Sequence, residues 1–94
     1  MATTAEVLRL AATLVEDAAT AGLDVPYVNV YAGHRAHVTL LTDEDPDADA
    51  LAAALRLEQA GPAIWEAEID GLNVRTHRKA TDAETAAWRA RVPA

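Results

Sequence analysis

Residues 64–77 read IWEAEIDGLNVRTH, two alternating runs of apolar and polar residues on either side of Asp70-Gly71. An Asp-Gly pair between alternating runs is the strongest short-range signal of a β-hairpin, because both positions of the tight turn need positive φ angles. Pairing across this turn gives an apolar face with Ile69 opposite Leu72, Ala67 opposite Val74 and Trp65 opposite Thr76. The other face then pairs Glu68 with Asn73, Glu66 with Arg75 and Ile64 with His77. The opposite charges of Glu66 and Arg75 suit a solvated sheet surface and support this register.

A second hairpin is predicted from residues 25–41, with its loop at Gly33-His34-Arg35. A slip of one residue would turn one strand over, so the favoured register is the one that keeps the aliphatic side chains together. That register sets Val30 opposite Val38 and Val28 opposite Leu40 on the core face. On the other face it sets Tyr31 opposite His37 and Asn29 opposite Thr39.

Capping boxes indicate where the first and the third helix begin. Thr3 and Glu6 have the spacing at which each side chain bonds the other's backbone N–H, and apolar residues recur at helical intervals after them. This helix is expected to end near Ala21-Gly22, because glycine takes the left-handed conformation that follows many helices. Thr81 and Glu84 repeat the capping spacing and predict a third helix that begins at Thr81.

The second helix is predicted between the two hairpins. Asp45 is expected to be its N-cap, with Pro46 at the first helical position, where proline is favoured. Gly61-Pro62 is expected to stop it. In the third helix Trp88 is the one large side chain available as an anchor, and residues 91–94 are expected to fray.

These elements predict a single α+β domain of residues 1–94 in the order αββαββα. The expected core is a four-stranded antiparallel sheet with at least the first two helices on one face. A helix followed by two strands occurs over residues 4–41 and again over residues 46–78, which leaves open an internal αββ duplication.

Composition narrows the range of partners. The net charge is −7 and Lys79 is the single lysine, which argues against nucleic acid as a partner because phosphate neutralisation needs clustered basic residues. The high alanine content and the excess of arginine over lysine favour a bacterial source. No signal peptide and no apolar run of membrane-spanning length is evident, so we expect a cytoplasmic protein without a membrane contact.

The chain lacks both serine and cysteine, which excludes catalysis by a serine or cysteine nucleophile. No glycine-rich phosphate-binding motif is present, so no cofactor is predicted. Whether the protein is an enzyme stays uncertain, with a non-enzyme favoured. The absence of phenylalanine and the abundance of alanine predict a thin core, which makes self-association a plausible source of further stability.

The face of the sheet turned away from the core is the candidate binding face. We expect it to present Tyr27, Asn29, Tyr31, His37, Thr39, Glu66, Arg75 and His77, with Ile64 and Asn73 beside them. Tyrosine is enriched in protein interfaces because it offers a large, stiff contact area with a polar tip. The alternative explanation is that these tyrosines reflect strand propensity, or that the third helix covers them.

The leading hypothesis is therefore a non-catalytic protein-binding or regulatory module. It would bind a protein partner, itself as a homodimer, or both, as an inhibitor or accessory protein of a phage, plasmid or bacterial regulatory system. A second hypothesis is a small-ligand or metal-binding protein, including an enzyme, that uses His37, His77 and Glu66 in a cleft. A third, a mimic of duplex DNA, rests on the charge of −7 alone.

Overall fold

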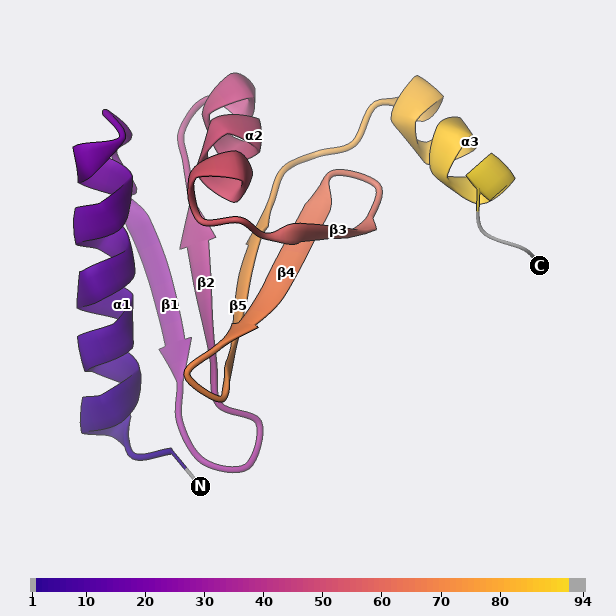
Figure 1. Ribbon diagram of the computed structural model, residues 1–94. Coiled ribbons are helices and arrows are strands. Elements are labelled where there is room, and N and C mark those ends of the chain that lie inside the picture. Colours follow the sequence, from indigo (N-terminus) through magenta and orange to yellow (C-terminus); the bar gives the residue numbers. More distant parts are fainter. Residues whose placement is uncertain (1, 92–94) are drawn as a thin grey trace.

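The computed structural model describes residues 2–91, which form three helices and five strands (Figure 1). The elements are α1 (Thr4–Thr20), β1 (Tyr27–Tyr31), β2 (His37–Leu41), α2 (Asp45–Ala54), β3 (Glu58–Gly61), β4 (Ile64–Ile69), β5 (Leu72–His77) and α3 (Asp82–Arg91). The strand order in the sheet is β1-β2-β5-β4-β3. The α+β class is as predicted. The sheet, however, has five strands and is mixed, because β2 pairs with β5 in parallel and the other neighbours are antiparallel. Residues 92–94, part of the segment predicted to fray, lie outside the described residues.

The extra strand is β3, which the sequence pattern assigned to the second helix. That helix ends at Ala54 rather than at Gly61-Pro62, and Arg56 adopts a left-handed φ of 57° just after its C-cap. Residues 58–61, EQAG, include no β-branched or aromatic residue that would predict a strand. They are extended because they pair with β4, with Glu58 opposite Glu66. Tertiary pairing therefore overrides a weak local preference.

Both predicted hairpin registers are confirmed. Every pairing set out above for β1 with β2 and for β4 with β5 occurs. Asp70 and Gly71 have φ angles of 52° and 78°, as the tight turn requires. The parallel contact then places Val38 beside Val74, so the apolar faces of the two hairpins become one continuous surface.

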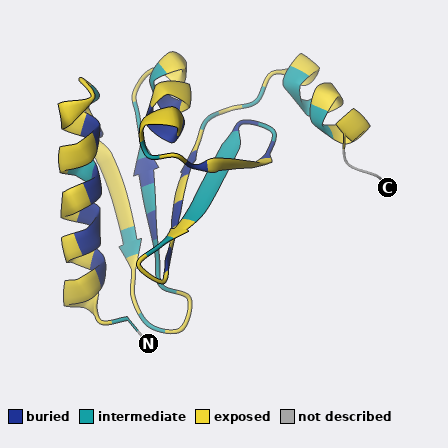
Figure 2. Ribbon diagram, in the orientation of Figure 1, coloured by how far each residue is buried: buried dark blue, intermediate teal, exposed yellow. Residues whose placement is uncertain are grey.

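Helices α1 and α2 cover that apolar surface. The buried cluster draws residues from α1, α2, β2 and β5, and the burial colours of Figure 2 show the dark-blue side of α1 turned toward the sheet. Its most enclosed large side chains include Leu40 of β2 and Leu51 of α2, both fully buried. Because every strand residue in this cluster belongs to the same sheet face, both helices lie on that face, as predicted.

The topology of the sheet does not support an internal αββ duplication. A two-fold axis normal to the sheet would make the central strands antiparallel, but β2 and β5 are parallel. A two-fold axis along the strands would put α1 and α2 on opposite faces, but both pack into one cluster. In addition, β3 follows α2 and nothing equivalent follows α1 in the described chain. No rotation within the sheet therefore relates the two halves.

The helix caps agree with the sequence at two of three places. The Thr3–Glu6 capping box is present, and Thr81 and Glu84 exchange the same pair of hydrogen bonds at the start of α3. The N-cap of α2 is Glu44 rather than Asp45, which is already helical, and Glu44 makes no side-chain cap bond. The prediction for α2 was therefore one residue late.

Trp88 is not the anchor of α3. None of the described residues of α3 is buried, and in Figure 1 this helix stands clear of the sheet. The ring of Trp88 is half-buried and lies 5.5 Å from the guanidinium carbon of Arg91, one turn along the same helix. Consequently α3 covers neither face of the sheet.

The core predicts one stability measurement. Leu40→Ala removes a fully buried side chain from the centre of the cluster and should lower the free energy of unfolding by about 2–5 kcal/mol. Leu41→Ala, in the same strand but half-buried on the opposite face, is the matched control and should cost clearly less. Urea unfolding followed by tryptophan fluorescence measures both. Equal losses would mean that the core does not lie between the helices and this face.

A substitution at Thr76 is expected to raise the free energy of unfolding. Its side chain is fully buried on the core face of β5, and its hydroxyl has no hydrogen-bond partner within residues 2–91. Burying an unsatisfied hydroxyl is unfavourable, so Thr76→Val should raise the free energy of unfolding by about 1 kcal/mol. Thr39→Val, on the solvated face, should change it little. A destabilised Thr76→Val protein would show that the hydroxyl does have a partner.

Candidate functional site

The sheet face opposite α1 and α2 carries the predicted binding residues. We call it the open face and define it by alternate residues of four strands: Tyr27, Asn29, Tyr31, His37, Thr39, Leu41, Ile64, Glu66, Glu68, Asn73, Arg75 and His77. The structure brings all eight predicted site residues to this face. Leu41 was not predicted, although its pairing with Tyr27 follows from the same alternation, and that signal would have found it.

One half of the open face is aromatic. Tyr27 and Tyr31 of β1 keep 57% and 56% of their surface exposed. Tyr31 stacks on His37 of β2, with ring centroids 4.3 Å apart and an angle of 24° between the planes. The Nδ1 of His37 lies 2.9 Å from the carbonyl oxygen of Arg35, and because a carbonyl only accepts, Nδ1 donates. These contacts fix the orientation of the His37 ring.

The other half of the open face is charged. Arg75 of β5 donates from Nε and Nη2 to one carboxylate oxygen of Glu66 on β4, at 2.9 and 2.6 Å. This is the predicted cross-strand pair. Exposed ion pairs of this kind add little stability, so its main effect is to fix the two side chains relative to each other. Glu68 and Glu58 lie on the same side, which makes this half acidic overall.

The residues of the metal and ligand hypothesis do not converge. His37 lies beside Asn73 of β5, whereas His77 is four residues farther along that strand, about 13 Å away at the usual rise of an extended chain. The Glu66 carboxylate is engaged by Arg75. Within residues 2–91 no three His, Asp or Glu side chains are grouped so that they could hold a metal ion. His37, His77 and Glu66 are therefore not brought together at one site on the open face.

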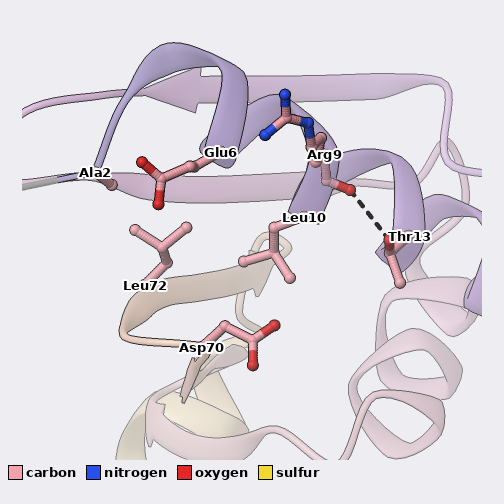
Figure 3. Close-up of a pocket in the computed structure, with 7 residues that line it drawn as sticks. All are labelled: Ala2, Glu6, Arg9, Leu10, Thr13, Asp70 and Leu72. Atoms are coloured by element: carbon pink, nitrogen blue, oxygen red, sulfur yellow. Dashed lines mark hydrogen bonds between the residues drawn. The ribbon is translucent and has the colours of Figure 1, made fainter.

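A hollow of about 320 Å³ lies on the helix side of the molecule, between α1 and the turn of the β4–β5 hairpin (Figure 3). Glu6, Arg9 and Thr13 of α1 line it together with Asp70. Hydrogen bonds from Thr3 at the helix cap lower the pKa of Glu6, and the Thr13 hydroxyl donates to the Arg9 carbonyl. Glu6 therefore caps α1 and the Thr13 hydroxyl is bonded within α1. These side chains do not form an acid–base pair.

A second hollow, of about 360 Å³, is lined in part by Arg78, the residue that follows β5. The Arg78 side chain is only 12% exposed. It donates to Glu84 of α3 at 2.6 and 2.8 Å and to Asp49 of α2 at 2.8 and 3.3 Å, and it lies 5.6 Å from the ring of Trp65. Sequence spacing gives no sign of the Arg78–Glu84 pair, because the two side chains come close only through the fold. This cluster connects α2, β5 and α3.

The charges of this cluster support one another. Hydrogen bonds from Arg78, followed by one from the Thr81 backbone, lower the pKa of Glu84 to about 2. Glu84 and then Asp49 raise the pKa of Arg78 further above its usual range. Arg78 and Glu84 therefore stay charged near neutral pH, and their mutual attraction positions α3.

No family model, curated protein or solved structure matches this chain. Among the described residues, no helix has both the length and the apolar content needed to cross a membrane.

The ion pair between Glu84 and Arg78 predicts that the free energy of unfolding depends on pH. Because the pKa of Glu84 is about 2 when folded and 4.5 ordinarily, its stabilisation is complete above pH 4.5 and is lost as the pH falls toward 2. Glu84→Gln should therefore be less stable than the wild type at neutral pH, and the difference should shrink on acidification. Urea unfolding at neutral pH and near pH 3 measures this, with Asp82→Asn in the same helical turn as the control. A difference independent of pH would contradict the ion pair.

Proposed function

We propose that this protein is a non-catalytic protein-binding or regulatory module that acts through its open face. The observation that carries the proposal is the exposure of Tyr27 and Tyr31, each above half of its surface, on a sheet face that no described element covers. Single exposed apolar groups are ordinary, but here Leu41, opposite Tyr27, and the ring of His37, stacked on Tyr31, continue the patch onto β2.

The two halves of the face define the partner's chemistry. The tyrosines offer stiff rings with hydroxyl tips. They suit a partner whose surface has apolar side chains next to hydrogen-bonding groups. Glu58, Glu66 and Glu68 outnumber Arg75 on the adjoining half, which favours basic residues at the partner's rim. The net charge of −7 would accelerate the approach of such a partner.

The proposed biological role rests on the same features. A small acidic module with no serine or cysteine nucleophile and one broad recognition face is suited to occupy a surface on another protein. An inhibitor or accessory protein of a bacterial, phage or plasmid regulatory system would work in this way. The partner would then be recognised by its apolar patch and basic rim.

The test compares two variants that add the same charge at different places. Thr39→Glu puts a carboxylate in the middle of the open face, between Asn29 and Arg75, whereas Ala50→Glu puts one on the exposed side of α2. Quantitative affinity capture from the source cells, followed by cross-linking of the recovered complex, should give a partner that Thr39→Glu loses and Ala50→Glu keeps. Circular dichroism verifies that both variants fold. A partner that both variants retain would refute the open face as the binding site.

A further inference from the structure

The outer edge of β1 is open to pairing with another strand. β1 pairs with β2 on one side, and within residues 2–91 no strand pairs with its other side. Proteins usually protect such an edge with charges, proline, a bulge or a very short strand, since its free N–H and C=O groups can pair with another chain. The opposite edge, β3, has three of these protections: it is four residues long, contains Glu58, and is irregular between Gln59 and Gly61. β1, five residues long, contains no charge, no proline and no bulge, although Pro26 stands directly before it.

The sequence of β1 is a palindrome, Tyr-Val-Asn-Val-Tyr. When two copies of such a strand pair antiparallel about the central Asn29, each Tyr27 lies opposite the partner's Tyr31 and each Val28 opposite the partner's Val30. Identical side chains then meet in matched cross-strand pairs, an arrangement that favours aromatic and β-branched residues. A two-fold interface requires this kind of self-complementarity. No other strand of the sheet reads the same in both directions.

Helix α1 presents a second apolar surface beside the same edge. Its buried stripe faces the sheet, and one flank, with Glu6, Arg9 and Thr13, faces the β4–β5 turn across the hollow shown in Figure 3. Since β4 and β5 lie inward from β1, the opposite flank faces outward past the β1 edge. This outward flank consists of residues spaced alternately three and four apart, all apolar: Ala5, Leu8, Ala12, Val15 and Ala19. Leu8 keeps 51% of its surface exposed there.

We propose that two copies of this chain join β1 to β1, antiparallel about Asn29, and form one continuous ten-stranded sheet. The two-fold axis is normal to the sheet, so both α1 helices stay on the same face and run antiparallel, with their outward flanks in contact. The interface covers Val28, which is 39% exposed in the single chain, together with Leu8. The palindromic strand and the outward flank of α1 contain no charged residue, so two acidic chains meet there without direct repulsion.

This interface goes beyond the proposed function, because it uses an edge rather than the open face. In the dimer the open face stays accessible. Its aromatic half is doubled. Across the junction, Tyr27 of one copy lies opposite the partner's Tyr31, and Tyr31 lies opposite the partner's Tyr27. The dimer therefore presents one central aromatic surface flanked by two acidic ones.

A single cysteine tests the register. The chain has no cysteine of its own, so Asn29→Cys places one thiol per chain on the two-fold axis. Directly opposite residues in antiparallel strands have Cα atoms about 4.5–5.5 Å apart, within the range that a disulfide spans. Under mild oxidation Asn29→Cys should form a covalent dimer. Glu58→Cys, on the β3 edge, is the control and should stay monomeric on a denaturing gel. A mixture of Tyr27→Cys and Tyr31→Cys should cross-link more than either variant alone.

Sedimentation equilibrium tests the helix contact. The wild type should be dimeric in the micromolar range. Leu8→Glu should weaken the dimer about tenfold or more, because it buries two carboxylates in an apolar contact. Thr13→Glu, on the inward flank of α1, should leave the dimer unchanged. A monomeric wild type, or cross-linking of Glu58→Cys as efficient as that of Asn29→Cys, would overturn the proposal. A dimer lost in Thr39→Glu but kept in Leu8→Glu would overturn it too and place self-association on the open face.

Discussion

The parallel contact between β2 and β5 is the constraint on which the rest of the structure depends. Each hairpin has one apolar face, but a two-stranded hairpin by itself is marginal at best. Placing Val38 beside Val74 merges the two faces into a surface wide enough for α1 and α2 together. The same contact brings the other faces of the hairpins together, so one pairing creates both the core and the open face.

The helices cover only one side of this sheet. The first two pack into the common core, and α3 is held away from both faces by the charged cluster around Arg78 rather than by apolar packing. A protein of this size with a single covered face retains a large exposed sheet surface. The open face is therefore a direct result of the topology, and its aromatic half is the part that solubility alone would not favour.

Local sequence signals predicted the parts of the fold that local chemistry controls. The Asp70-Gly71 turn, the alternation in both hairpins and the caps at Thr3 and Thr81 specified registers and boundaries that the structure confirms. All the predicted open-face residues follow from that alternation. What the sequence did not predict is long-range: the strand order, the parallel contact and β3, whose residues have no strand preference and are extended because β4 is available to pair with them. The ion pair between Glu84 and Arg78 was not predicted for the same reason, since Arg78 approaches Glu84 only through the fold.

The contact between β2 and β5 also has a consequence for how the chain reaches this structure. Its two strands are distant in the sequence and are separated by α2, β3 and β4, whereas each hairpin closes through a short loop. Loop-closure entropy makes such a distant pairing slower than either turn. We therefore expect the hairpins to form first, with their aliphatic faces still hydrated, and the two halves to dock in a later step that removes this surface from water. During synthesis the apolar face of the first hairpin would then precede that of the second, and α1 is the element available to cover it in the interval.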